Sequence, residues 1–415
     1  METVSRFNQT GEKWNGRKIA PAPGLAEICI TNEAESAMNH RRHSQNGQHP
    51  NGLGNGSRRE GHDRLKIALV STPFLAVPPH NYGGTELIIY ELAEGLVQAG
   101  HEVVLFATGD SRTSGELRSL YPTPQWPPNQ LVDLNHASWG MQQIALENFD
   151  VVHAHSAVAL ALGRLAMDVP LVYTLHHPPV PDFSTFYQDF PEVHYIAISK
   201  RQMELETRLP RCRVIHHALD ASRFQCTDHP QGYVCFVGRY SDVKGPHTAI
   251  DAAQIAGLPI RVAGEVHEPD REFARRELNH RLKLPHVTEL GCINVPKKVP
   301  LLRDARALLT PITWEEPFGL IIIEAMLSGC PVVSFPCGSA PELIDQGVTG
   351  YLVKDLKEMA DAIKPGGPLD RFDRRKCRQV AERRFGRDRL IADHVRLYHS
   401  AIKNRRPAHG AHASV

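Results

Sequence analysis

Short runs of consecutive apolar residues recur along the chain, and longer stretches with helical patterning separate them. Runs of this length without polar alternation are typical of parallel strands that helices cover on both faces. In the first half we expect strands at Lys66–Val70, Glu102–Ala107, Val151–His153, Leu171–Thr174, Tyr195–Ile198 and Arg213–His216. The pattern restarts after a polar stretch, with strands expected at Tyr233–Val237, Ile260–Ala263, Val287–Leu290, Ala307–Thr310 and Pro331–Phe335.

This alternation of strands and helices predicts an α/β fold with two Rossmann-like, doubly wound parallel sheets that face each other across a cleft. Three helices have clear limits. Thr85 is expected to cap a helix that Gly100 ends, and Gly329 is expected to end a helix over Leu320–Ser328. A long terminal helix is expected over Arg387–Lys403. Ligands of such folds bind at the carboxyl ends of the strands.

Both ends of the chain have a different composition. The stretch from Asn39 to Asp63 has almost no large apolar residues, and the last residues resemble it. Such segments cannot bury enough apolar surface to fold. We therefore expect a disordered extension at 1–64, one Rossmann-like domain at 65–222, a second at 230–386, a terminal helix at 387–403 and a flexible tail at 404–415.

Composition and charge narrow the classes of function. The chain has 415 residues, 41% of them hydrophobic, and a formal net charge of +1, so no broad positive field favours nucleic acid or anionic membrane. No apolar run is long enough to span a membrane and no signal peptide is evident, which predicts a cytoplasmic protein. The eight cysteines form no Cys-x-x-Cys pair, so we expect reduced, buried thiols rather than disulfides or a metal site.

The segment from Glu316 to Glu324 combines two carboxylates with Pro-Phe-Gly and an apolar helix. It is expected to form a loop that leads from a buried strand into a helix N-terminus, where free N–H groups and the helix dipole favour a phosphate. Apolar residues surround Glu324, so its carboxylate is expected to be buried and to need a partner. A nucleotide-sugar matches this layout, with one carboxylate for the sugar and one for the ribose.

Three other motifs lie at expected strand ends or helix starts. Gly83 and Gly84 open the first helix and allow close approach of a ligand, although a Gly pair is also common in ordinary turns. Arg239 and Lys244 follow the first strand of the second half, where two cations are suited to bind a diphosphate. His176 ends a strand of the first half and is either a site residue or a structural histidine.

A metal site is not expected. The chain has no Asp-x-Asp motif to hold a divalent metal beside phosphates. His153 and His155 have strand spacing, but no third ligand is evident. Cations and helix dipoles are therefore expected to neutralise a bound phosphate.

Five motifs occur together in one order: Gly83-Gly84-x-Glu86, Thr174-x-His176, Gly238-Arg239…Lys244-Gly245, Glu316-x7-Glu324 and Gly347-Val-Thr-Gly350-Tyr-Leu-Val. In order and approximate spacing, the chain resembles the retaining glycosyltransferases of family 4, which have the two-domain GT-B fold. The resemblance covers about residues 66–403. It implies a hexosyltransferase-type enzyme that moves a sugar from a nucleotide-diphosphate sugar to an acceptor hydroxyl, with no metal and no cofactor beyond this co-substrate.

The resemblance also implies roles for the residues above. Glu316 and His176 would be catalytic and contact the sugar, while the amides of Phe318, Gly319 and Leu320 would bind sugar and phosphate. The diphosphate would lie against Arg239, Lys244, Gly83 and Gly84, and Glu324 would bind the ribose. The N-terminal domain would receive the acceptor, and the terminal helix would cross back to it. In this family the leaving phosphate is usually proposed to take the acceptor proton, without a covalent intermediate.

The chain departs from the pattern of this family at two places. Close relatives often have Lys where this chain has Glu265, whose carboxylate would repel a diphosphate. Family members often carry Asn-Gly before the Asp near the linker, where this chain has His216-His217-Ala218-Leu219-Asp220. Two alternative functions stay open. One is another GT-B enzyme, such as a sugar-phosphate synthase or phosphorylase, and the other is a non-catalytic nucleotide-sugar-binding scaffold. One basic cluster is either solvated surface charge or a contact to anionic lipid or a phosphorylated acceptor: Lys200, Arg201, Arg208, Arg211 and Arg213.

Overall fold

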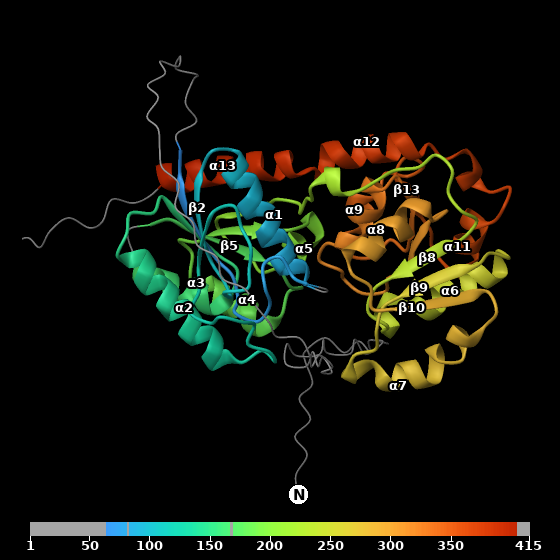
Figure 1. Cartoon of the computed structure of the whole chain (residues 1–415), viewed down its shortest axis with the longest axis horizontal. Coiled ribbons are helices and arrows are strands. Elements are labelled where there is room, and N and C mark those ends of the chain that lie inside the picture. The colour runs from blue at the N-terminus through green and yellow to red at the C-terminus, as the bar shows by residue number, and fades with distance from the viewer. Residues whose placement is uncertain (1–63, 81–82, 167–168, 405–415) are drawn as a thin grey trace, which may run out of the picture.

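The computed structural model describes residues 64–80, 83–166 and 169–404, and shows two lobes side by side (Figure 1). Nearly all of the expected N-terminal extension and C-terminal tail lies outside these residues. Each lobe has one parallel sheet covered by helices, which confirms the predicted fold class. The predicted domain boundaries stay a prediction, and each sheet lies within one of the two predicted domains.

The sheet of the first lobe has the order β3-β2-β1-β4-β5-β6-β7, and all its strands are parallel. The central strands are largely apolar because helices cover both faces, whereas the edge strands β3 and β7 carry charged residues. They are β1 Lys66–Val70, β2 Glu102–Phe106, β3 Glu116–Arg118, β4 Val151–Ala154, β5 Leu171–Leu175, β6 His194–Ala197 and β7 Cys212–Val214. The helices of this lobe are α1 Gly84–Gln98, α2 Gln130–Ala145, α3 Ala157–Gly163, α4 Pro181–Gln188 and α5 Lys200–Leu205.

The second lobe repeats this architecture, with the order β10-β9-β8-β11-β12-β13. Its parallel strands are β8 Val234–Val237, β9 Ile260–Ala263, β10 Val287–Gly291, β11 Leu308–Thr310, β12 Val332–Ser334 and β13 Gly350–Leu352. The helices are α6 Pro246–Ile255, α7 Arg271–Phe273, α8 Val295–Asp304, α9 Leu320–Leu327, α10 Ala340–Leu343, α11 Leu356–Ile363 and α12 Arg374–Phe385.

Helix α13, Arg387–Lys403, begins next to α12 and returns to the first lobe (Figure 1). Its buried face, which includes Leu390 and Tyr398, joins the core that contains Leu92 and Leu96 of α1. The chain therefore crosses between the lobes twice, once through the segment after β7 and once through α13. No described helix is both long and apolar enough to cross a bilayer.

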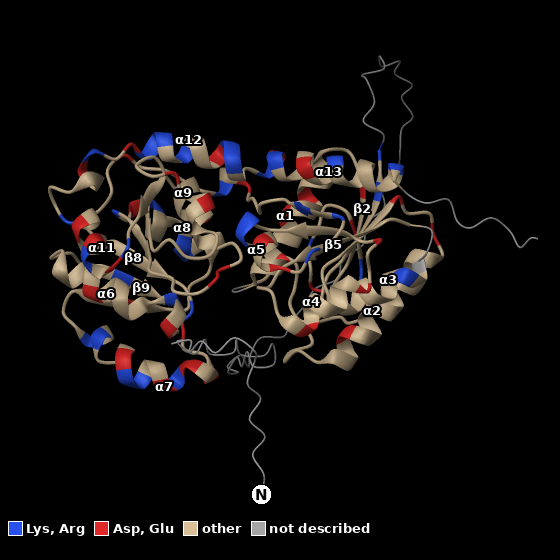
Figure 2. Cartoon of the chain, turned by 180° about the vertical axis from the view of Figure 1, so that it is seen from behind, with Lys and Arg blue, Asp and Glu red and all other residues tan. Residues whose placement is uncertain are grey.

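Helix α12 is rich in arginine (Figure 2), but several of these side chains have structural partners. Arg374 donates to the carbonyl oxygens of Ala305 and Arg303 at 2.9 and 2.6 Å, and Arg378 donates to that of Phe224 at 2.7 Å. These arginines bind α12 to the second lobe and to the segment that joins the lobes.

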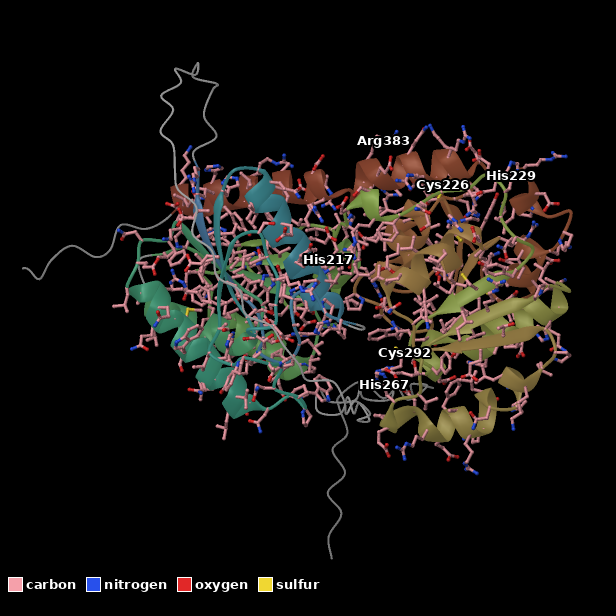
Figure 3. The ribbon with its side chains drawn as sticks, in the orientation of Figure 1. His217, Cys226, His229, His267, Cys292 and Arg383 are labelled. Carbon is pink, nitrogen blue, oxygen red and sulfur yellow. The ribbon has the colours of Figure 1, made fainter. Side chains whose placement is uncertain are left out.

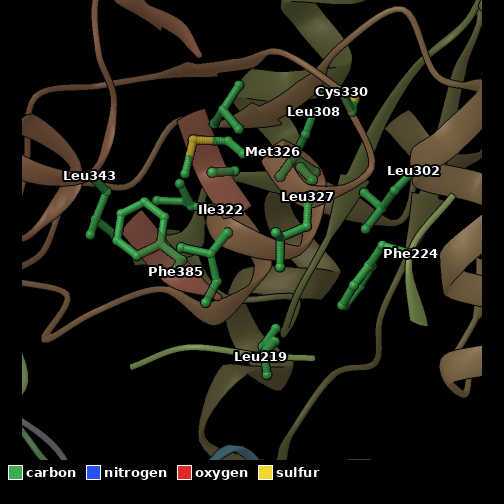
Figure 4. Close-up of a cluster of buried hydrophobic side chains, with 14 of the residues drawn as sticks. Leu219, Phe224, Leu302, Leu308, Ile322, Met326, Leu327, Cys330, Leu343 and Phe385 are labelled. Atoms are coloured by element: carbon green, nitrogen blue, oxygen red, sulfur yellow. The ribbon is translucent and has the colours of Figure 1, made fainter. Parts of the chain in front are cut away.

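Helix α9 lies at the centre of one hydrophobic core (Figure 4), where Ile322, Met326 and Leu327 are buried among residues of neighbouring elements. Leu219 and Phe224 of the connecting segment and Phe385 of α12 join the same cluster. The position of the α9 N-terminus is thus fixed by packing on several sides.

Three local predictions differ from the structure. Thr85 does not cap the first helix, because that helix already begins at Gly84, and Gly83 is its N-cap without a side-chain hydrogen bond. The strands β3 and β13 were not among the strands expected, since β3 has two charged residues, Glu116 and Arg118, and β13 begins with a glycine. The seven cysteines within the described residues are free thiols, but only Cys235, Cys330 and Cys377 are buried and Cys292 is exposed, so the expectation of buried thiols holds for only three of them.

Replacing Asp133 with Asn is expected to stabilise the protein at neutral pH. Burial raises the pKa of this α2 carboxyl to about 6, and a hydrogen bond from Ser156 only partly opposes the shift. The folded state therefore prefers the protonated carboxyl, so stability falls as pH rises from about 4 to about 6. Because Asn is always neutral, Asp133→Asn should raise the free energy of unfolding by up to ~3 kcal/mol at pH 7.5.

Urea unfolding of both proteins at pH 5 and pH 7.5 measures this effect. The gain from Asp133→Asn should be smaller at pH 5 by roughly 1 kcal/mol, because part of the wild-type carboxyl is then protonated. An equal gain at both pH values would show that burial of the charge is not its cause.

Candidate active site

The N-termini of two helices from different lobes meet at one place. Gly84, the first residue of α1, is so close to Leu320, the first residue of α9, that a Cβ at position 84 would lie 3.3 Å from Leu320 Cδ1. Neither helix has a side-chain hydrogen bond at its N-cap. Both therefore direct positive dipole ends towards this region, which favours an anion, and in α1 the buried Glu86 carboxyl takes one backbone N–H, its own.

Glu316 lies just before α9 and has two partners in the second lobe. The Nζ atom of Lys244 forms an ion pair with Glu316 Oε2, and Trp314 Nε1 donates to the same oxygen at 2.9 Å. Lys244 Nζ also lies 5.0 Å from the centre of the Trp314 ring. The lysine of one predicted motif and the glutamate of another are thus in direct contact. Trp314 contacts both and was not predicted.

The loop after β12 fixes the backbone of Glu316. Ser339 N donates to Glu316 O at 3.0 Å, and the Ser339 hydroxyl donates to the carbonyl oxygen of Phe318. Gly338, at φ +57°, packs so closely that a Cβ there would lie 2.4 Å from Glu316 N. Only glycine fits this position without moving the loop that leads into α9.

Replacing Gly338 with Ala should therefore displace Glu316. The positive φ alone costs an L-residue roughly 1–2 kcal/mol, and the clash adds to it. We expect a lower melting temperature and at least a ten-fold loss of activity, since displacement by about 1 Å can cost 100-fold. Gly347→Ala is the matched control, because Gly347 also has positive φ, at +73°, but a Cβ there would meet nothing within 4 Å. Equal loss of activity in both variants would contradict this explanation.

Glu324 is buried in α9, at 3% exposure, and has the partner that the sequence required. That partner is Lys298 of α8, whose Nζ donates to Glu324 Oε1 at 2.6 Å. Glu324 lies four residues beyond Leu320, about one helical turn from the α9 N-terminus. Lys298 was not predicted, because nothing in its local sequence marks it as the partner of a residue 26 positions away.

Arg239 follows β8 and faces a carboxylate. Its Nε atom lies 3.3 Å from Asp270 Oδ2, and neither atom has a hydrogen bond within the described chain. Glu265, which follows β9, is half exposed and lies 3.5 Å from His267 Nε2. Figure 3 shows His267 and Cys292 at the edge of the second lobe that faces the first. Arg239 thus faces Asp270, and the next residue, Tyr240, donates its backbone N–H to the carbonyl oxygen of Glu265 at 2.8 Å.

His176, at the end of β5, is one of several histidines between the lobes. Its ring stacks on that of His217 with centroids 5.6 Å apart, and the ring centroids of His217 and Phe318 of the second lobe are 5.1 Å apart. Figure 3 labels His217. Burial lowers the pKa of His176 to about 3, and the neighbouring His177 acts in the same direction. The ring is therefore neutral at physiological pH and is a poor proton acceptor.

The basic cluster also takes part in the contact between lobes. Arg201 of α5 donates two hydrogen bonds to Glu315, at 2.8 and 2.6 Å. Glu342 of α10 accepts from the backbone N–H groups of Lys200 and Arg201 and lies 3.0 Å from His216 Nε2. Arg201 was expected either to be solvated surface charge or to contact a lipid or an acceptor. It instead pairs with Glu315, the residue before Glu316, and so joins that residue to the first lobe.

The paired histidines His153 and His155 have other partners. His153 lies 2.8 Å from both Tyr398 Oη and Thr174 Oγ1 through its two ring nitrogens. Within the described residues, no three His, Cys, Asp or Glu side chains are arranged to hold a metal ion.

Two family models match the chain. Residues 82–223 match Glycosyltransferase Family 4, and residues 231–365 match Glycosyl transferases group 1. Together they span most of both lobes, in the order that the motifs require. The chain belongs to the family 4 glycosyltransferases. It is a transferase with the GT-B fold, which confirms the resemblance drawn from the five motifs.

Individual relatives of this glycosyltransferase are distant. The D-inositol 3-phosphate glycosyltransferase of Pseudarthrobacter chlorophenolicus is 25% identical over 81% of this chain and 94% of its own length. AviGT4, a glycosyltransferase of avilamycin A biosynthesis, is 24% identical, with a TM-score of 0.64 over 82% of this chain and 98% of its own. Anabaena HepE, solved with UDP and glucose, is 22% identical, with a TM-score of 0.63 over 81% and 100%.

Proposed function

We propose that this glycosyltransferase moves a sugar from a nucleoside diphosphate sugar to an acceptor hydroxyl, with retention at the anomeric carbon and without a metal. The observation that supports it most is the meeting of the α1 and α9 N-termini beside Lys244 and Glu316. Two helix ends and a lysine provide positive charge for a diphosphate, and the carboxylate beside them can accept hydrogen bonds from sugar hydroxyls.

In this proposal the second lobe holds the donor. Lys244 and Arg239 bind the diphosphate, together with the amides of Gly319 and Leu320 and the start of α1 at Gly83 and Gly84. Glu316 binds sugar hydroxyls through the oxygen that Lys244 does not occupy. Glu324 binds the ribose hydroxyls, with Lys298 neutralising its buried charge. HepE, which shares the fold, has been solved with UDP and glucose, and this agrees with such a donor.

The chemical step needs no side-chain base. The bond between the anomeric carbon and the phosphate oxygen breaks, and the acceptor oxygen bonds to the same face of that carbon. The acceptor proton passes to an oxygen of the leaving diphosphate. A neutral His176 with a pKa of about 3 is unsuited to take this proton. The protein would act mainly by positioning and by stabilising the charge of the leaving group, with lysine and arginine in place of a metal ion.

A donor panel tests this function. Purified protein would be incubated with UDP-, GDP- and ADP-sugars in EDTA and with a mixture of acceptors that includes an inositol phosphate, and the anomeric configuration of each product would be read by NMR. The expected result is one productive donor and a product with the anomeric configuration of the donor. An inverted product, or activity only after Mg²⁺ is added, would contradict the proposal. Donor binding without hydrolysis or transfer would favour a non-catalytic scaffold.

A further inference from the structure

Five histidines form a continuous group behind the proposed sugar site. The ring centroids of His153 and His155 are 4.3 Å apart, those of His155 and His176 are 5.2 Å apart, and those of His176 and His217 are 5.6 Å apart. His394 of α13 lies 5.7 Å from His153. Burial lowers the pKa of every ring in the group, to about 4 for His394. Each ring is therefore neutral and has a single N–H.

One hydrogen bond in this group has two possible directions. His155 Nδ1 lies 2.9 Å from His176 Nε2, so one of these atoms donates and the other accepts. If His155 donates, the hydrogen of His176 is on Nδ1. If His176 donates, the hydrogen of His155 is on its Nε2 atom. The two arrangements present opposite hydrogen-bonding groups at the free Nδ1 atom of His176.

The other nitrogen of His155 favours one direction. His155 Nε2 is buried and has no hydrogen-bond partner among the described residues. A hydrogen on this atom would be an unsatisfied buried donor, and orphaned buried N–H groups are rarer in folded proteins than unpaired acceptors. A bare nitrogen at the same place avoids the orphaned N–H. The favoured arrangement therefore has His155 Nδ1 donating to His176 Nε2.

We propose that His155 is a positioning residue that holds His176 in the tautomer with hydrogen on Nδ1, as a neutral donor to a hydroxyl of the transferred sugar. The His176 ring is partly exposed, and its Nδ1 atom has no hydrogen bond within the described residues. This inference rests on the proposed function, in which His176 contacts the donor sugar. It assigns His176 the task of orienting the sugar and excludes it as a general base.

The tautomer can be measured without substrate. The full-length protein, labelled with ¹⁵N-histidine, would be studied by two-bond ¹H–¹⁵N correlation NMR at pH 7.5, and the His176 signals identified by their absence in His176→Gln. The pattern of an Nδ1–H tautomer is the expected result. An Nε2–H pattern, or a mixture of both, would overturn the inference, including the case in which a buried water pairs with His155 Nε2. This result does not depend on any transferase activity.

Two substitutions of His155 test the consequence for catalysis. His155→Leu removes the donor, whereas His155→Asn keeps an amide near the position of Nδ1. His155→Leu should lower kcat by about ten-fold, because it mixes the tautomers of His176 and also frees the ring to move, and a misplaced group can cost up to ~100-fold. His155→Asn should recover most of this loss, and in His155→Leu the His176 tautomer should become mixed.

Tyr398→Phe is the matched control, because it removes a hydrogen bond from the same histidine group, that of His153, without touching His155 or His176. It should keep kcat within about two-fold of wild type. Equal losses in His155→Leu, His155→Asn and Tyr398→Phe would show that the group matters only for packing and would contradict the positioning role. If no variant and no wild type transfers sugar but the tautomer is as expected, the proposed function fails and the assignment of His155 stands.

Discussion

Lys244→Ala should reduce kcat by about 100- to 1,000-fold, the range seen when one preorganised group that stabilises transition-state charge is removed. Lys244 pairs with Glu316 and lies over Trp314, next to the point where two helix N-termini meet. Its loss removes a cation from the proposed leaving group and leaves the Glu316 carboxylate without its ion pair. Two charges that act together are thus disrupted by one substitution.

Steady-state kinetics of Lys244→Ala and two further variants check this prediction. Lys244→Arg keeps the charge but changes its geometry, so its activity should lie between those of wild type and Lys244→Ala. Lys354→Ala is the matched control, since the Lys354 side chain is 84% exposed and forms a surface ion pair with Glu358. An effect of Lys244→Ala below ten-fold would show that Lys244 does not stabilise the leaving group.

Glu91→Ala should lower the free energy of unfolding by up to ~3–5 kcal/mol, because it removes the buried partner of two arginines and leaves Arg387 with the longer ion pair to Asp220, at 3.3 Å. Glu91 of α1 has no exposed surface and accepts from three groups outside its own helix. Arg387 Nε donates at 2.7 Å from the start of α13, and Arg223 Nη1 donates at 2.9 Å. Asp220 N donates at 3.0 Å. One carboxylate thus binds both segments that cross between the lobes.

Urea unfolding measures this loss, and a double variant tests its cause. Glu91→Ala with Arg387→Ala should be less destabilising than the sum of the single changes, because each single variant already breaks the same ion pair. Asp361→Ala is the control: Asp361 is about half exposed and pairs with a half-exposed lysine, so its loss should cost less than about 0.5 kcal/mol. Strict additivity in the double variant would contradict the proposed coupling.

Much of the fold could be predicted from the sequence because its strands are apolar on both faces. A run such as Leu171–Thr174 has few interpretations other than a covered parallel strand, and the structure places β5 there. The terminal helix was predicted with its observed limits, Arg387–Lys403. The strands β3 and β13 were missed because β3 has the charged residues Glu116 and Arg118 and β13 begins with Gly350, so neither has the pattern of an apolar strand.

The candidate site was predicted in part, through residues that share a local motif. Glu316 and Lys244 could be selected because each lies beside a predicted strand end, and the structure pairs them. Their supporting residues come from distant elements and have no local signature. Lys298 reaches Glu324 from α8, and Ser339 holds the Glu316 loop from beyond β12. Such partners depend on how helices pack, which one sequence does not encode as a visible pattern.

The partner of His155 could not be predicted from the sequence either. The sequence marked it as half of a His-x-His pair, and the natural question was whether the pair binds metal. Its structural partner is His176, 21 positions away, at 2.9 Å. The strands β4 and β5 are neighbours in the sheet, which brings their carboxyl ends together. Sheet order, rather than spacing along the chain, therefore decides which histidines meet.

Calorimetric titration with UDP, GDP and ADP in EDTA tests the central claim most directly. The claim is that a nucleoside diphosphate binds where the N-termini of α1 and α9 meet, held by Lys244 and Arg239 without a metal. We predict that one of these diphosphates binds wild type and that binding is lost in the double variant Arg239→Ala, Lys244→Ala. Equal binding by both proteins, or binding by wild type only after Mg²⁺ replaces EDTA, would contradict the claim.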